Sequence, residues 1–147
     1  MKKFKLALGS DHAGYVLKEK VKDYLINKGY ETEDFGCYSE ERADYADFAH
    51  SVADNIESKK ADLGILVCGS GNGINMAANK HKSIRAALCW NPELAELSRQ
   101  HNDANVLSLP ARFISEEEAI KCVDAFLESE FEGGRHTERV NKINKIN

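Results

Sequence analysis

The chain has 147 residues, of which 42% are hydrophobic and 30% are charged, and its formal net charge is -4 at pH 7. This length and this balance predict one soluble globular domain rather than a disordered chain. The negative charge disfavours a general affinity for nucleic acid or for an anionic membrane surface. No apolar run approaches the ~20 residues that span a bilayer, so we predict a cytoplasmic protein with no membrane partner.

Several short apolar runs in the chain end in glycine or small polar residues. This pattern is typical of strands that are buried on both faces of a parallel sheet. The clearest are 5–10 (KLALGS) and 63–68 (LGILVC), and weaker strands are predicted at 30–35, 85–90 and 105–109.

Helical patterns lie between these strands. The apolar faces comprise Leu17, Val21, Tyr24 and Leu25 in the first helix, and Tyr45, Phe48, Ala49, Val52, Ala53 and Ile56 in the second. Asn91 before Pro92, and Ser115 with Glu118, are N-terminal capping patterns for two later helices.

The alternation of strand and helix, five times over, predicts a three-layer α/β/α, Rossmann-like single domain over residues 1–147, with a five-stranded parallel sheet and right-handed crossovers. Gly133 and Gly134 end the last long helix, and residues 132–147 form a C-terminal tail with a short tail helix. The tail has an apolar stripe that we expect to pack on a partner subunit. The stripe contains Val140, Ile143 and Ile146.

Ligands of open parallel sheets bind beyond the carboxyl ends of the strands, where neighbouring crossovers leave on opposite sides. Two segments occupy such positions, 9–14 (GSDHAG) after the first strand and 68–73 (CGSGNG) after the third. If these strands are neighbours, Asp11, His12 and Cys68 share one crevice.

The second segment carries the stronger signal. Its three alternate glycines allow backbone N–H groups to form a cup for an anion or a developing oxyanion, at the start of a helix predicted at 74–79. A thiol at a helix N-terminus is expected to have a lowered pKa, so Cys68 is a candidate base or nucleophile. The alternative is a buried cysteine followed by a structural glycine turn. Position 74 is isoleucine, which excludes a C-x5-R phosphatase loop, a Walker loop and a dinucleotide fingerprint.

Other candidates have structural alternatives that the sequence leaves open. Asp11 could cap a helix, with His12 on the surface, and His101 with Asn102 could cap the end of the helix that begins at Pro92. Arg135 and Arg139 are four residues apart, so both guanidinium groups could face one phosphate or simply form a solvated basic tail. The remaining cysteines, together with His50 and His81, are assigned no role. These cysteines are Cys37, Cys89 and Cys122, and the chain has no C-x-x-C pair.

At these positions the sequence resembles ribose-5-phosphate isomerase of type B, within the family of ribose, galactose and allose phosphate isomerases. The motifs that carry the resemblance are GSDHAG at 9–14, SEERADY at 39–45, CGSGNG at 68–73, SRQHNDANV at 98–106 and EGGRH at 132–136.

The resemblance implies interconversion of ribose 5-phosphate and ribulose 5-phosphate in the pentose phosphate pathway. It implies a homodimer or dimer of dimers with an active site between subunits, and neither a metal nor a cofactor. It further implies that Cys68 is the base moving the proton between C1 and C2, that His101 opens the sugar ring, and that Asp11 steers protons on the sugar oxygens.

By the same resemblance, a hydroxyl and backbone amides hold the enediolate oxygen. These belong to Ser70 and to Gly69, Gly71, Asn72 and Gly73. The resemblance also implies that the phosphate is bound by His12, Arg135 and Arg139. Asn102 and Arg112 occupy further ligand-contacting positions. Many members of the family have threonine where this chain has Ser70, so the hydroxyl here is less restricted in its rotamer.

Three other functions stay open at this point. The substrate could be a hexose phosphate, such as allose or galactose 6-phosphate. The chain could be a non-catalytic phosphosugar-binding module or one subunit of a heteromeric isomerase. A Cys-His hydrolase or transferase would instead form a covalent adduct on Cys68.

Overall fold

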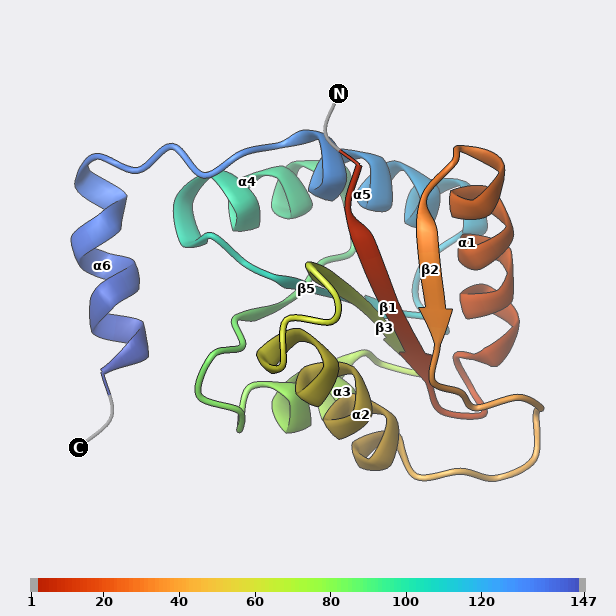
Figure 1. Cartoon of the computed structure of the whole chain (residues 1–147). Helices are drawn as coiled ribbons and strands as arrows, with labels where there is room; N and C mark the ends of the chain where they lie inside the picture. Colours follow the sequence, from red (N-terminus) through yellow and green to blue (C-terminus); the bar gives the residue numbers. More distant parts are fainter. Residues whose placement is uncertain (1–2, 146–147) are drawn as a thin grey trace.

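The protein is described by a computed structural model that covers residues 3–145. Strands and helices alternate along the chain, as the sequence predicts (Figure 1). The elements are β1 (Lys5–Ser10), α1 (Tyr15–Asn27), β2 (Glu31–Asp34), α2 (Tyr45–Glu57), β3 (Leu63–Cys68), α3 (Asn72–Ala78), β4 (Ala86–Leu88), α4 (Pro92–Asn102), β5 (Val106–Pro110), α5 (Glu116–Glu128) and α6 (Arg135–Asn144). The predicted strands β1 and β3 match these bounds, whereas α3 begins two residues earlier than predicted.

The five strands form one parallel sheet in the order β2-β1-β3-β5-β4. The central strand β3 is buried along its whole length, which accounts for its continuous apolar sequence. The two edge strands are different. Strand β2 reads Glu-Thr-Glu-Asp, with alternating exposed and half-buried residues, and β4 has only three residues.

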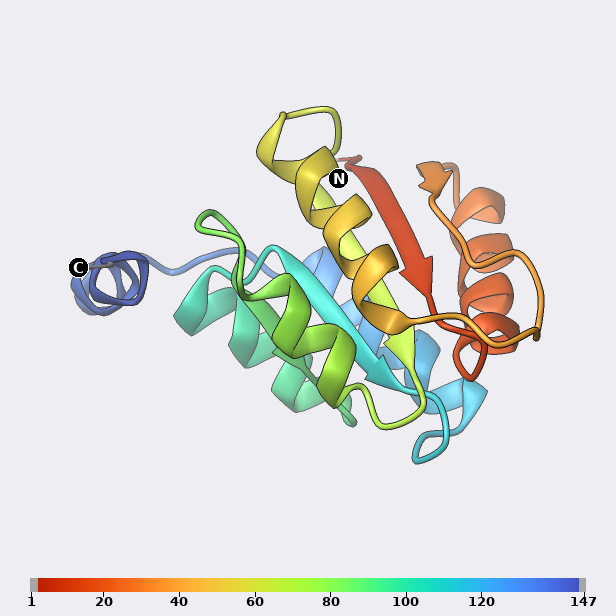
Figure 2. The same cartoon turned by 90° about the horizontal axis from the view of Figure 1, so that it is seen from below.

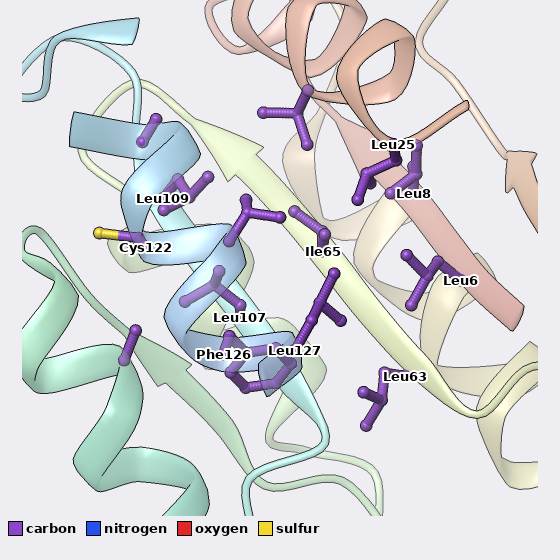
Figure 3. Close-up of a cluster of buried hydrophobic side chains, with 14 of the residues drawn as sticks. Leu6, Leu8, Leu25, Leu63, Ile65, Leu107, Leu109, Cys122, Phe126 and Leu127 are labelled. Atoms are coloured by element: carbon purple, nitrogen blue, oxygen red, sulfur yellow. The ribbon is translucent and has the colours of Figure 1, made fainter. Parts of the chain in front are cut away.

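Helices cover both faces of the sheet, so the three-layer α/β/α prediction is confirmed (Figures 1 and 2). On one face, α1, α4 and α5 bury the larger apolar cluster, which Figure 3 shows between α5, α1 and the strands. Phe126 and Leu127 of α5 meet Leu107 and Ile65 of the sheet there. On the other face, α2 and α3 pack through a smaller cluster that includes the Cys68 side chain.

The capping patterns read from the sequence are confirmed at α4 and α5. The Asn91 side chain accepts a hydrogen bond from the Leu94 amide, and the Ser115 hydroxyl accepts one from the Glu118 amide. The proposed apolar face of α2 is wrong at one residue, because Tyr45 is 45% exposed while Val52 is fully buried. Tyr45 instead lies at the mouth of the cavity described below.

One buried cation connects α1 to the loop after β2. The Lys18 side chain is 1% exposed, and its ammonium lies 2.7 Å from both carboxylate oxygens of Asp34 and 2.8 Å from the carbonyl oxygen of Cys37. Burial tends to raise the pKa of Asp34, but hydrogen bonds from Lys18, the Gly36 amide and Lys22 outweigh it and lower the pKa.

The tail helix α6 stands apart from the main body of the sheet (Figures 1 and 2). It packs beside α4, and its Asn144 accepts a hydrogen bond from Arg85, the residue before β4, at 3.1 Å. Gly133 and Gly134 both have positive φ angles, 66° and 53°, where the chain turns into α6. Of the apolar stripe predicted in the tail, Val140 is 6% exposed and Ile143 is 55% exposed. Ile146 lies outside the described residues.

Candidate active site at the carboxyl ends of β1 and β3

Strands β1 and β3 are neighbours, which is the arrangement that the crevice prediction needs. Ser10 pairs with Val67, and the Asp11 amide donates a hydrogen bond to the Val67 carbonyl oxygen at 3.2 Å. Helix α1, which follows β1, and helix α3, which follows β3, cover opposite faces of the sheet. The carboxyl ends of β1 and β3 are therefore a topological switch point, and Asp11 and Cys68 lie beside it.

The last glycine of the GSDHAG motif, Gly14, lies so close to the backbone of β3 that no side chain fits there. A Cβ atom on Gly14 would lie 2.4 Å from the Val67 carbonyl oxygen and 2.9 Å from the Val67 Cβ, so a side chain here would collide with β3. One carboxylate oxygen of Asp11 accepts a hydrogen bond from the Gly14 amide at 2.9 Å. Asp11 thus closes the turn that precedes α1 but does not cap the helix itself, whose N-cap residue is Gly14 and has no side-chain cap hydrogen bond.

A cavity of about 460 Å³ opens at this switch point. Residues from four segments of the chain line it. They are Asp11, His12 and Ala13; Arg42, Ala43, Asp44 and Tyr45; Cys68, Gly69, Ser70 and Gly73; and Arg112 and Phe113. Cys68 is only 4% exposed, but it belongs to the lining of this cavity, which is large enough for a small ligand.

The prediction of a lowered thiol pKa at Cys68 is wrong for this chain. Burial raises the pKa of the Cys68 thiol, and the negative charge of Asp11 adds to the increase. The nearby backbone N–H groups of Ile74, Gly71 and Ser70 favour the thiolate and oppose the increase without reversing it. Helix α3 has seven residues, so the favourable field at its start is weaker here than the cost of burying a thiolate.

The glycine-rich loop turns sharply before α3, as its sequence predicts. Gly71 has a φ angle of 76° in the left-handed region, and a Cβ there would lie 2.4 Å from Leu88 Cδ1. Gly73 leaves room for the ring of Tyr45, which a Cβ would meet at 2.5 Å. The Ser70 hydroxyl accepts a hydrogen bond from the Asn72 amide at 3.2 Å. Gly71 and Asn72 shape this loop but are not part of the cavity lining.

Sequence reasoning missed a wall of the cavity. The segment 42–45 lies across it, and the Nδ1 atom of His12 is 3.2 Å from both the backbone N and the backbone O of Ala43. Arg42, Tyr45 and Phe113 are exposed and line the mouth. The signal that could have found part of this wall is SEERADY at 39–45, which supports the resemblance but was given no role.

His101 does not lie near Cys68 within one chain. It is the second-last residue of α4, close to the start of β5, whereas Cys68 ends β3. Since β3 and β5 are parallel, His101 lies near the amino ends of the strands and Cys68 lies at their carboxyl ends. Asn102 lines a separate cavity of about 370 Å³ with Arg85, Ile143 and Asn144. Arg135 and Arg139 are exposed on α6.

Comparison with known proteins decides the family. Residues 6–143 match the ribose/galactose isomerase family. This chain belongs to that family. A curated relative, ribose-5-phosphate isomerase B of Escherichia coli, is 46% identical to this isomerase over 142 residues, which are 97% of this chain and 95% of the relative.

Solved structures agree with this assignment over the whole fold. A ribose 5-phosphate isomerase from Thermotoga maritima is 52% identical, and its structure superposes with a TM-score of 0.97. The superposition covers 99% of this isomerase and all of that chain. Ribose-5-phosphate isomerase B from Mycoplasma genitalium, solved with bound ribulose-5-phosphate, is 46% identical, with a TM-score of 0.90 over 95% of this chain and 93% of that one.

The other cysteines of this isomerase are buried away from the cavity and unpaired. Burial raises the pKa of Cys89 to about 11 and that of Cys122 to about 12, so both remain protonated thiols. His50 and His81, which sequence reasoning left without a role, lie 2.7 Å apart through Nδ1 and Nε2. Among residues 3–145, no helix is long and apolar enough to cross a bilayer.

Proposed function

We propose that the chain interconverts ribose 5-phosphate and ribulose 5-phosphate, with Cys68 as the base that moves a proton between C1 and C2. The observation that carries the proposal is the 460 Å³ cavity at the switch point, because it places Cys68 and Asp11 on one wall in a family of sugar isomerases. The relatives named above, including the one solved with ribulose-5-phosphate, favour a pentose phosphate substrate.

The proposed reaction makes two demands, and the cavity offers groups for both. A base must remove a carbon-bound proton next to the carbonyl, and the resulting enediolate needs donors that are worth about 3–4 kcal/mol each. Cys68 would act as the thiolate, which the N–H groups of Ser70, Gly71 and Ile74 stabilise. The Ser70 hydroxyl and the amides of residues 69–73 would hold the oxygen, and Asp11 would guide protons on the sugar hydroxyls.

We further propose that the complete site forms between two subunits. In this proposal His101 is the acid that opens the furanose ring, and Arg135 and Arg139 bind the phosphate. These residues cannot reach Cys68 in the same chain, because they lie away from the carboxyl ends of the strands. A partner related by two-fold symmetry could bring its α4 and α6 to the cavity. His12, Asn102 and Arg112 would complete the contacts to the sugar phosphate. The exposed Ile143 and the distance of α6 from the sheet fit such a role.

The proposed setting is a single-domain enzyme of the cytoplasm, in the pentose phosphate pathway, acting without metal or cofactor. A hexose phosphate is the second candidate substrate, since the family name itself includes galactose. Turnover of ribose 5-phosphate compared with that of allose and galactose 6-phosphates decides between them.

The direct test is Cys68→Ala. We expect loss of isomerisation and, with ribose 5-phosphate in D₂O, loss of the solvent-derived deuterium that a proton shuttle would leave at C1 of ribulose 5-phosphate, while phosphosugar binding stays nearly intact. Cys122→Ala is the control, because it removes a buried thiol that does not line the cavity. Turnover at the parent rate in Cys68→Ala would rule out this residue as the base.

The shared site has its own test by complementation. Cys68→Ala and His101→Ala should each be inactive alone. After unfolding together and refolding in equal amounts, they should recover about one quarter of the parent activity, because half of the dimers are mixed and each mixed dimer has one intact site. No recovery, in a mixture shown to contain mixed dimers, would contradict a site divided between subunits.

A further inference from the structure

Two histidine rings stack where the chain passes over the end of α4 on its way from α5 to α6 (Figure 1). The ring centroids of His101 and His136 are 4.3 Å apart, and the ring planes are inclined by only 12°. His101 is the second-last residue of α4, and His136 is the second residue of α6. The stack therefore brings a residue with no role so far, His136, against the residue proposed to open the sugar ring.

The two rings differ in how far they are exposed. The His101 side chain is 38% exposed, whereas the His136 side chain is 7% exposed. Within residues 3–145, neither ring nitrogen of His101 makes a hydrogen bond. A half-exposed side chain without hydrogen bonds can adopt several rotamers, and a buried ring against its face restricts them. His136 is thus a platform for the more exposed ring.

The platform is itself fixed by the backbone. The Glu132 amide donates a hydrogen bond to the Gln100 carbonyl oxygen at 3.0 Å, which holds residue 132 against the end of α4. The positive φ angles of Gly133 and Gly134 then turn the chain. The His136 amide donates to the Gly133 carbonyl oxygen at 3.0 Å. The position of the His136 ring is therefore set relative to α4.

A carboxylate lies beside the stack. One Glu132 oxygen is 3.8 Å from the Nε2 atom of His101 and 3.5 Å from that of His136, so it acts through its charge rather than through short hydrogen bonds. Burial lowers the pKa of His136, and the positive charge of His101 lowers it further. Arg135 and Arg139 act in the same direction, and Glu132 acts against it. His136 is therefore mainly the neutral ring at pH 7.

Ring opening depends on where the acid lies. The bond between C1 and the ring oxygen breaks as the ring oxygen takes a proton from His101 and becomes the C4 hydroxyl. The C1 hydroxyl gives its proton to Asp11 and becomes the aldehyde. The acid must lie within hydrogen-bond reach of the ring oxygen, and a displacement of about 1 Å can cost about 100-fold in rate. A half-exposed acid at a helix end needs a fixed ring.

We propose that His136 and Glu132 are positioning residues for His101. The His136 ring holds the His101 ring in the orientation for proton transfer, and the Glu132 carboxylate places negative charge beside the imidazolium form that acts as the acid. The inference rests on the proposed function, because it takes His101 to be the ring-opening acid. The alternative is that this corner only attaches α6 to α4.

The substrate pair offers a reaction that omits ring opening. Ribulose 5-phosphate has its carbonyl at C2, and its C5 oxygen carries the phosphate, so it cannot close into a furanose. Uptake of solvent deuterium at C1 of ribulose 5-phosphate in D₂O therefore needs Cys68 as the base but not His101. Isomerisation of ribose 5-phosphate, which is a furanose in solution, needs both residues. Comparison of the two rates isolates the ring-opening step.

The test variants are His136→Leu, which keeps bulk at a buried position but removes the flat ring, and Glu132→Gln, at a half-exposed side chain. For His136→Leu we expect kcat for isomerisation to fall about 10- to 100-fold while deuterium uptake stays near the parent rate. For Glu132→Gln we expect the same pattern with a fall of about fivefold, as for one charge lost near another at high dielectric. His136→Phe restores a flat ring and should recover most of the rate.

Two further variants calibrate the comparison. His101→Asn should lose isomerisation and keep deuterium uptake. His50→Asn removes a histidine from the other contacting pair, His50 with His81, and should match the parent in both reactions. A structural role alone would lower both reactions together and would not be rescued by phenylalanine. Thermal unfolding and the oligomeric state are measured for each variant.

The outcomes separate this inference from the proposed function. If His101→Asn loses only isomerisation while His136→Leu and Glu132→Gln keep the parent rate, the positioning role is overturned and the proposed function stands. Equal loss of both reactions in His136→Leu also overturns it. Isomerisation at the parent rate in His101→Asn would remove the ring-opening acid itself, and the positioning role with it.

Discussion

Replacing Gly14 by alanine should damage both the fold and the site. The new Cβ would lie 2.4 Å from the Val67 carbonyl oxygen, whereas Cβ atoms in proteins essentially never come closer than 3.0 Å to such an atom. The obstacle is backbone of the central sheet and cannot rotate away, so the start of α1 must move by at least about 0.6 Å. Overpacking of this kind costs about 3 kcal/mol, at the upper end of its usual range.

For a chain of this size, that loss corresponds to a fall in melting temperature of roughly 6–12 °C. Activity should fall further than stability explains, because the Gly14 amide holds the Asp11 carboxylate, and a shift of ~1 Å at a catalytic group can cost about 100-fold in rate. Thermal unfolding measures the first effect, and turnover of ribose 5-phosphate well below the melting temperature measures the second.

Gly69→Ala is the matched control for stability. Its new Cβ would approach only the side chain of Arg112, at 3.1 Å, and that side chain can move. We expect its unfolding free energy to stay within about 1 kcal/mol of the parent. The close-approach argument is refuted if Gly14→Ala is as stable as Gly69→Ala.

Two further predictions concern charge. Asp34→Asn should lower the free energy of unfolding by about 3 kcal/mol in urea denaturation, because it leaves the buried Lys18 ammonium with a weaker partner, whereas Glu31→Gln, at an exposed ion pair, should cost less than about 1 kcal/mol. Since the folded-state pKa of Asp34 is lowered, this stabilisation should be complete above the ordinary aspartate pKa of about 3.9 and lost as pH falls through the lowered value; equal acid sensitivity of parent and Asp34→Asn would contradict it. Because the pKa of Cys68 is raised, its alkylation rate should keep increasing with pH from 7 to 9, and a plateau near pH 7 would instead favour the lowered pKa predicted from the sequence.

The sequence predicted the structure best where a feature depends only on the chemistry of neighbouring residues. The continuous apolar run of 63–68 predicted a central strand, and the caps at Asn91 and Ser115 predicted two helix starts, because each depends on local chemistry alone. The sequence alone did not establish that β1 and β3 are neighbours in the sheet. The structure shows that they are, through the pairing of Ser10 with Val67.

What the sequence could not show depends on distance along the chain. The pKa of Cys68 is set by burial and by Asp11, 57 residues away, so the local reading of a thiol before a helix gave the wrong direction. The ion pair of Lys18 with Asp34 joins helix α1 to the end of strand β2, and the apolar periodicity of α1 does not reveal it. Tyr45 fits the spacing of an apolar face but lies over Gly73, at the cavity mouth.

The borders of the sheet limit how two copies of this chain can meet. Strand β2 presents the exposed carboxylates of Glu31 and Glu33, so a second β2 laid alongside would bring carboxylates together. At the other border, β4 has only three residues and offers a short ladder. Continuation of the sheet from one molecule into the next is therefore disfavoured at both ends. Helices and loops are the surfaces left for contact between two copies, and they carry His101, Arg135 and Arg139, the residues proposed to reach the sugar from a partner subunit.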